Sequence, residues 1–199
     1  MSLSSRTLCT LEELKQYLGL SDNDKDMLLE KLIESSSNII INYVGYDPHK
    51  RTYTDKLYSG DGTNRMYLVD IPIISVSAIK QEDVAMSAGD LSNIKIHDSY
   101  LEGRSYIWVH SYDDNYKLTY IAGYDPDSAD ADKAADAKSV LAMFSWVAMR
   151  IAGLMYKETG PQGMLGVSSQ SFDISSRTFY ETQLTNYLHE LDNYVRAPV

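Results

Sequence analysis

The chain has 199 residues, of which 44% are hydrophobic and 11% aromatic, and it carries a formal net charge of −10. This length and composition suffice for one domain with a sizeable core, or for one domain with a sub-domain, and they exclude general disorder. The acidic balance argues against tight nucleic-acid binding, because that binding needs clustered Lys and Arg that release counterions from phosphates.

Cys9 is the only cysteine, so one chain can form neither a disulfide nor a cysteine-based metal site. No apolar run approaches the ~20 residues that span a bilayer, and the first ten residues lack the apolar stretch of a signal peptide. We therefore expect a protein of a reducing cytoplasm that has no membrane partner.

Two helices are expected within the first fifty residues. Thr10 and Glu13 have the spacing of a capping box, and Gly19 suits the left-handed conformation that ends a helix. A second helix is expected from Ser21, because acidic residues favour a helix N-terminus and apolar residues then recur at spacings of three and four until Gly45.

From about residue 51 to residue 123 the hydrophobic pattern alternates, which is typical of strands with one covered face. Glycine, asparagine, aspartate and serine separate the apolar stretches. We therefore expect an inserted antiparallel sheet. Its expected strands are residues 52–58, 65–69, 73–80, 93–97, 104–110 and 115–121.

The remaining residues predict two more helices, one over about 128–157 and one over about 176–194. The fold class is thus α+β, a bundle of about four helices with an inserted antiparallel β-sheet or hairpin region. The helical core is expected over residues 1–50 and 124–199 and the β region over 51–123, in one compact domain with a sub-domain. The residues expected in one helical core are Leu28, Leu32, Ile33, Ile40, Phe144, Val147 and Ile151.

Glycines flank Asp61 between two apolar stretches, as in a loop that binds phosphate. The segment Gly60-Asp61-Gly62 lacks the third glycine and the Lys-Ser/Thr pair of such loops, and a strand follows it where a helix should begin. We interpret it as the corner of a β-hairpin, in which glycine supplies positive φ angles.

No other motif indicates a catalytic or metal-binding site. Asp22, Asp24 and Asp26 have the spacing of a calcium loop, but Met27 and Ile33 stand where that loop needs glycine and glutamate. The four histidines are scattered, without a partner at metal-ligand spacing. We therefore expect no catalytic residues, no cofactor and no metal, and we expect function to reside in surfaces. The 16 tyrosines favour interfaces of this kind.

The stretch LCTLEELKQYLGLSDNDKDMLLEKLIESSSNIIINYVG, at residues 8–45, is followed at residues 57–79 by LYSGDGTNRMYLVDIPIISVSAI. Together they resemble the N-terminal half of the head–tail connector proteins of phages and prophages, the adaptor family that docks beneath the portal. The resemblance covers residues 8–80, and the rest of the chain matches only in its architecture. The β region from about 81 to 123 is longer than in compact helical members of the family.

The resemblance implies a structural protein of the virion neck that is assembled in the host cytoplasm. It would form a homo-oligomeric ring, a dodecamer matched to the portal. DNA would pass through this ring without specific binding, along an acidic wall. Its partners would be the portal protein and the next neck, stopper or tail-completion protein.

Family members meet the portal through the C-terminal helix and tail, and meet the next neck protein through β loops. The residues implied to contact the portal are Met164, Leu165, Val167, Tyr194, Val195, Arg196, Pro198 and Val199. Those implied to contact the next neck protein are Ser59, Gly60, Asp61, Gly62 and Asn64.

Two alternatives remain open from the sequence. The chain could be another ring protein of the neck or a tail-completion protein, which shares the need for ring assembly. It could also be an enzyme whose site gathers residues far apart in sequence. Such an enzyme would show a pocket in which at least two polar groups perturb one another's pKa.

Overall fold

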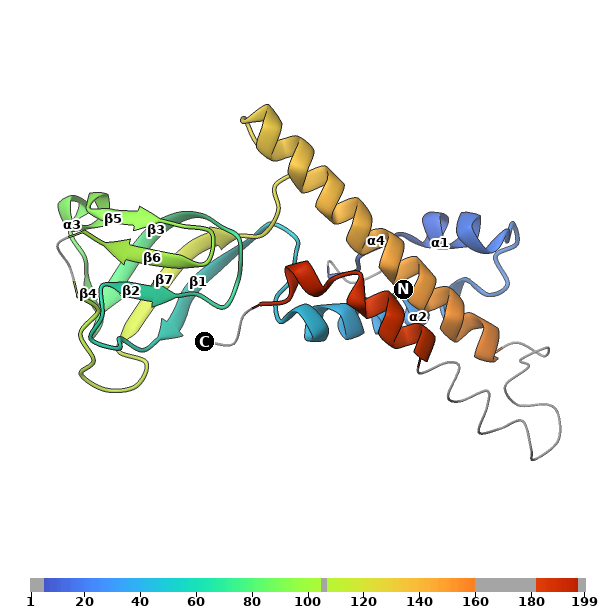
Figure 1. The fold of residues 1–199 in the computed structure, drawn as a ribbon, viewed down its shortest axis with the longest axis horizontal. Coiled ribbons are helices and arrows are strands. Elements are labelled where there is room, and N and C mark those ends of the chain that lie inside the picture. Colours follow the sequence, from blue (N-terminus) through green and yellow to red (C-terminus); the bar gives the residue numbers. More distant parts are fainter. Residues whose placement is uncertain (1–5, 105–106, 160–181, 197–199) are drawn as a thin grey trace. The chain divides into compact units, whose positions relative to one another are not determined.

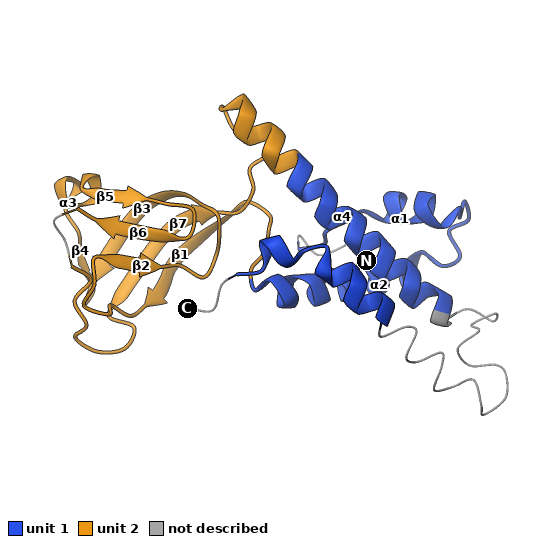
Figure 2. Cartoon of the chain, viewed as in Figure 1, with its two compact units in different colours: residues 1–45, 139–197 blue, residues 46–138, 198–199 orange. Residues whose placement is uncertain are grey.

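The computed structural model describes residues 6–104, 107–159 and 182–196, and it has the expected α+β composition (Figure 1). The chain divides into two compact units (Figure 2). Unit 1 comprises residues 1–45 and 139–197, and unit 2 comprises residues 46–138 and 198–199. The second unit therefore begins a few residues before the expected β region and includes the first turns of the long helix.

Unit 1 is helical. It contains α1 (Leu11–Leu18), α2 (Asp26–Val44), most of α4 (Ala131–Thr159), a helical run over residues 182–189 and a short 3₁₀ helix, η1 (Asp192–Tyr194). The capping box of α1 is confirmed: the Glu13 amide donates to Thr10 Oγ1 at 3.2 Å and the Thr10 amide donates to Glu13 Oε2 at 2.7 Å. Gly19 ends α1 with a φ of +68°.

The expected start of α2 at Ser21 is wrong, because the helix begins at Asp26. The Lys15 ammonium donates to Asn23 Oδ1 at 2.6 Å and to Asp26 Oδ1 at 2.8 Å. These bonds tie the connecting turn back to α1. Several acidic residues in succession favour a helix start without fixing which of them begins it.

The core of unit 1 draws buried side chains from α2 and α4. Ile33, Ile40, Phe144, Val147 and Ile151 are fully buried, as the sequence predicts. The prediction is wrong for the two remaining members of the set, which are only half-buried. These two are Leu28 and Leu32. The buried face of α2 lies one residue further along, and it includes Leu29, Ser36 and Ser37.

Unit 2 contains two antiparallel sheets. The first has the order β1-β7-β3-β4, with β1 at Arg51–Tyr58, β7 at Tyr116–Ala122, β3 at Ile73–Gln81 and β4 at Val84–Ala85. The second has the order β2-β6-β5, with β2 at Arg65–Tyr67, β6 at Tyr100–Gly103 and β5 at Ile94–Ile96. A short helix, α3 (Ala88–Ser92), precedes β5.

The two sheets share one buried core. Tyr116, Leu118 and Tyr120 alternate on the inner face of β7, and Met66 and Leu101 enter the same core from the second sheet. The strand expected over residues 104–110 is wrong, since β6 ends at Gly103 and residues 107–110 lie outside the strands. The expectation of antiparallel pairing is confirmed, but the single sheet is in fact two.

Contrary to the expectation from the sequence, residues Ala131–Lys157 of α4 are long and apolar enough to cross a membrane by length and composition alone. Phe144, Val147 and Ile151 of this helix are fully buried within the protein. A core helix of a soluble protein passes the same test, so the length of α4 supports no membrane assignment.

Candidate functional site

The loop at residues 59–64 connects β1 to β2. These two strands belong to different sheets, because β1 pairs with β7 and β2 pairs with β6. The interpretation of this loop as the corner of a β-hairpin is therefore wrong. It carries the chain from one sheet to the other, and no helix follows it to make a phosphate site.

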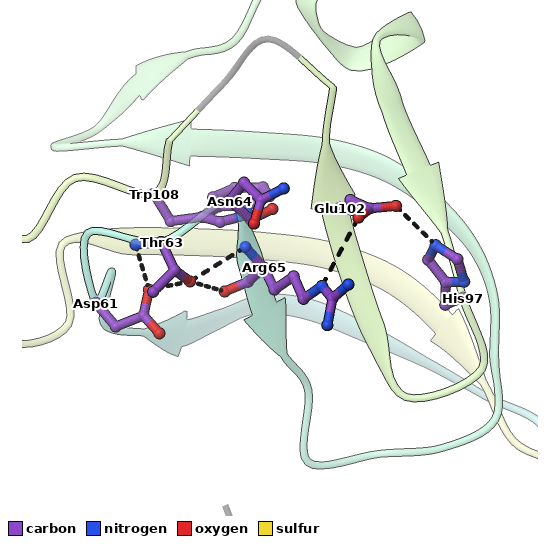
Figure 3. Close-up of polar contacts among 7 residues, drawn as sticks. All are labelled: Asp61, Thr63, Asn64, Arg65, His97, Glu102 and Trp108. Carbon is purple, nitrogen blue, oxygen red and sulfur yellow. Dashed lines mark hydrogen bonds and ion pairs between the residues drawn. The ribbon is translucent and has the colours of Figure 1, made fainter.

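The backbone of residues 107–110 holds this loop in place. The Gly62 amide donates to the Trp108 carbonyl, and the Trp108 amide donates to the Thr63 carbonyl, both at 2.8 Å. Trp108 is fully buried, and its indole Nε1 donates to the Asn64 carbonyl at 3.2 Å (Figure 3). Residues 107–110 thus pair with the loop, which explains why their alternating pattern resembles a strand.

The two glycines of the loop serve different purposes. Gly62 has a φ of +80°, as the sequence interpretation requires. A Cβ on Gly60 would lie 2.4 Å from the Val109 carbonyl oxygen and 2.6 Å from that of Trp108. Gly60 is therefore needed for close backbone approach, and because it is buried its role is to shape the loop.

Asn115 also holds the loop, and the sequence did not indicate it. Its buried side chain accepts from the Gly60 amide at 3.0 Å and donates to the Val109 carbonyl at 2.7 Å. One side chain thus joins two backbone segments. The only sequence signal is an asparagine directly before a buried strand, which is also common in ordinary turns.

Asp61 stabilises the exposed side of the loop. Its Oδ1 accepts from the Thr63 amide at 2.8 Å and from the Thr63 hydroxyl at 2.7 Å (Figure 3). Partial burial raises the pKa of Asp61, but the bonds from Thr63 lower it more, so the net direction is downward. The loop therefore presents a fixed negative charge, and Ser59, Asp61, Gly62 and Asn64 are all exposed.

A second surface lies on the outer face of the β2-β6-β5 sheet. Met66 and Leu101 point into the core, so their neighbours along each strand point outward. This surface, which we call the cation–aromatic face, was missed because its members come from three separate strands and the turn after β5. It consists of Arg65, Tyr67, Lys95, His97, Tyr100 and Glu102.

Glu102 lies at the centre of this face (Figure 3). Its carboxylate is 3.7 Å from Arg65 Nε and 3.2 Å from His97 Nε2. The hydrogen bond with His97, followed by the charge of Arg65, lowers the pKa of Glu102. The His97 ring stacks on Tyr100 at 4.2 Å, and the Arg65 guanidinium lies 5.2 Å from the Tyr100 ring centroid.

The C-terminal residues expected to contact the portal are described only in part. Tyr194 packs edge-on against Phe144, with ring centroids 5.7 Å apart, and the Arg196 amide donates to the Val44 carbonyl at 2.9 Å. Val195 is 41% exposed. The tail is thus tied to unit 1 up to Arg196. The other five expected residues, Met164, Leu165, Val167, Pro198 and Val199, lie outside the described residues.

Buried polar groups of unit 2 are paired with one another. Tyr120 donates to Asp70 Oδ2 at 2.6 Å and lies 2.6 Å from the Tyr58 hydroxyl, while Lys56 forms an ion pair with Asp70. Burial and these bonds raise the pKa of Tyr120, so it stays protonated. The network therefore supplies hydrogen-bond partners to polar groups that are buried within the sheet core.

Within the described ranges, no group of three or more His, Cys, Asp or Glu residues could hold a metal ion. Burial raises the pKa of the Cys9 thiol to about 12, so the thiol is not ionised at neutral pH.

Comparisons with known proteins agree with one another. Residues 7–140 match the family model described as "Head completion protein". Two structures of a gene transfer agent (GTA) neck match over all of this chain. The chain in the empty particle, computed with C6 symmetry, has a TM-score of 0.62, 12% identity and 96% of its own length covered. The chain in the native particle, computed with C12 symmetry, has a TM-score of 0.61, 11% identity and 94% of its length covered.

A third match, to the virion of the native GTA particle, has a TM-score of 0.56 and 12% identity, and it covers 92% of each chain. No curated protein matches the sequence.

The comparisons define a class of structural proteins of the virion. By the match over residues 7–140, the chain belongs to the head completion protein family. This confirms the resemblance to head–tail connector proteins, and the role of the chain is structural, in the neck of a virion.

Proposed function

We propose that copies of this chain form a closed ring beneath the portal of a virion, and that DNA passes through the ring. One observation carries this proposal: the fold matches, over its whole length, chains of a particle neck that was computed with C6 and C12 symmetry. A chain that occupies such a neck meets identical neighbours through heterologous contacts, which close into a ring. We take the ring to be a dodecamer that matches the portal.

The two ends of such a ring need different partners. The tail at Val195 and Arg196 and the segment around residues 164–167 are the proposed contacts with the portal. Tyr194 is a weaker candidate, since its ring packs against Phe144 in the core of unit 1. The exposed loop residues Ser59, Asp61, Gly62 and Asn64 are the proposed contacts with the next neck or tail-completion protein.

The charge of the chain suits a channel for DNA. With a net charge of −10, the ring would repel phosphates, so DNA would pass without adhering. The proposal therefore expects acidic residues along the channel wall. A wall lined chiefly by Lys and Arg in an assembled ring would contradict it.

Another ring protein of the neck or a tail-completion protein would share this fold and symmetry. Direct binding to the portal would favour the adaptor role, because the adaptor family is the one that docks beneath the portal. Membership of a structural family favours assembly over the remaining alternative, an enzyme with a dispersed site.

The role is tested by deleting the gene and imaging the particles by electron microscopy. We expect separate heads and tails, because the connection between them is lost, and we expect plasmid-borne wild type to restore joined virions. Joined virions at the wild-type frequency without this protein would overturn the proposal.

A further inference from the structure

The cation–aromatic face carries a surplus of positive charge on an acidic chain. Arg65 and Lys95 are both exposed, and Glu102 is the carboxylate between them. Elsewhere in unit 2, several lysines pair with nearby carboxylates. These pairs are Lys50–Asp125, Lys56–Asp70, Lys80–Asp55 and Lys117–Asp83. Arg65 likewise pairs with Glu102, so Arg65, Lys95 and Glu102 together leave one positive charge that the face can offer to a partner.

The same face is held in one geometry before any partner arrives. Arg65 lies against the Tyr100 ring, Tyr67 contacts that ring at 5.3 Å between centroids, and His97 stacks on it. Glu102 forms ion pairs with both the Arg65 and the His97 side chains. Side chains that are already ordered lose little entropy on binding, and exposed Tyr and Arg are enriched in protein interfaces.

We propose that this face binds the acidic segment at residues 127–136 of the neighbouring copy in the ring. This inference rests on the ring of the proposed function and adds the contact between its subunits. Charge complementarity carries it. The segment exposes four carboxylates against one ammonium, that of Lys133. The four are Asp127, Asp130, Asp132 and Asp136.

A second acidic segment, at residues 22–26, is a poorer occupant. Asp26 already pairs with Lys15 at 2.8 Å. Asp22 and Asp24 both interact electrostatically with the neighbouring Lys25. In contrast, Asp127, Asp132 and Asp136 form no ion pair with any described residue. The cation–aromatic face and the segment at 127–136 lie on different elements of unit 2. One patch therefore meets a different patch, as a closed ring requires.

The features of the face favour a protein over DNA. A chain with net charge −10 is poorly suited to the wide basic stripe that non-specific DNA binding uses, and this face carries two cationic side chains, Arg65 and Lys95. DNA is therefore treated as an alternative outcome of the test.

The experiment compares full-length variants for ring formation on purified portal, followed by electron microscopy and sedimentation. The first variant carries Arg65→Glu and Lys95→Glu, the second carries Asp132→Lys and Asp136→Lys, and the third carries all four changes. Asp130 is left intact because its Oδ1 accepts from the Asp132 and Lys133 amides at the start of α4. A matched control carries Lys31→Glu and Lys157→Glu, two exposed positions of unit 1.

We expect each two-site variant to need at least about tenfold more protein for ring formation, because like charges then face each other across the interface. We expect the four-site variant to recover most of this loss and the unit 1 control to match wild type. Unfolding temperatures measured for every variant identify losses due to misfolding. If the Glu variant misfolds, Arg65→Gln with Lys95→Gln replaces it, with a smaller expected loss.

Three results would overturn the inference. One is wild-type ring formation by the folded Arg65→Glu, Lys95→Glu variant. Another is loss in both two-site variants without recovery in the four-site variant. The third is an Arg65→Glu, Lys95→Glu variant whose rings are intact but no longer retain a duplex DNA oligonucleotide. This result would make the face a DNA contact. If wild type itself forms no ring on the portal, the proposed function fails, which is a different result from a ring that tolerates these changes.

Discussion

At the scale of single residues, the loop at 59–64 depends on Gly60. A Cβ at this position would overlap the carbonyl oxygens of Trp108 and Val109, and both are backbone atoms that cannot rotate away. We expect Gly60→Ala to lower the free energy of unfolding by about 2 kcal/mol or more, because two backbone segments must separate. Denaturant unfolding measures the change.

Gly89→Ala is the matched control for this prediction. Its Cβ would meet only the Ser87 hydroxyl at 3.7 Å, an ordinary contact, within the short helix α3. We expect its stability to stay within about 1 kcal/mol of wild type. Equal stability of the Gly60 and Gly89 variants would show that the loop does not need the close approach.

Asp47 predicts a dependence of stability on pH. Burial raises the pKa of Asp47, but hydrogen bonds from His49 and the charge of Arg51, 2.7 Å away, lower it by more. The pKa in the folded protein therefore lies below the usual 3.8. A lowered folded pKa stabilises the protein above the unfolded value, and this stabilisation is lost as pH falls through the folded value.

We therefore expect Asp47→Asn to be less stable than wild type at pH 7 and to approach wild type below about pH 4. Chemical unfolding at a series of pH values measures both curves. A constant difference between wild type and variant from pH 7 to pH 2 would contradict this assignment.

At the scale of elements, the sequence predicts what depends on neighbours along the chain. The capping box of Thr10, the end of α1 at Gly19 and the buried positions of α4 are all correct, because local bonds and helical spacing determine them. The fold class follows from the same patterns.

Strand pairing was not predictable in the same way. The assignment of β1 and β2 to different sheets depends on contacts with β7 and β6, about 35 to 70 residues away. The segment 107–110 has the alternation of a strand, yet it pairs with a loop instead. The cation–aromatic face was missed for the same reason, since three strands build it.

The core between α2 and α4 gives a prediction for the helical elements. Phe144 is fully buried and contacts Tyr194, so we expect Phe144→Ala to cost about 3 to 5 kcal/mol of unfolding free energy through lost burial and a cavity. Met27→Ala on α2, where the side chain is 69% exposed, is the control and should cost under about 1 kcal/mol. A cost under about 1 kcal/mol for Phe144→Ala would mean that these helices share no core.

At the scale of the whole molecule, the tail predicts a separation of folding from docking. Removing residues 195–199 leaves Tyr194 against Phe144 and takes away two described backbone bonds, from Val195 to Asp192 and from Arg196 to Val44. We expect the unfolding temperature to change little, while affinity for the portal falls severely, since chain ends of this kind commonly order on a partner. Affinity equal to wild type at the same salt concentration would remove the tail from the portal contact.

The central claim concerns assembly, and electron microscopy of the purified chain mixed with its portal tests it most directly. The account predicts a closed ring of this chain on one face of the portal, with twelve copies around an open channel whose wall is acidic. Portal rings that remain bare at saturating concentrations of the folded chain would contradict it.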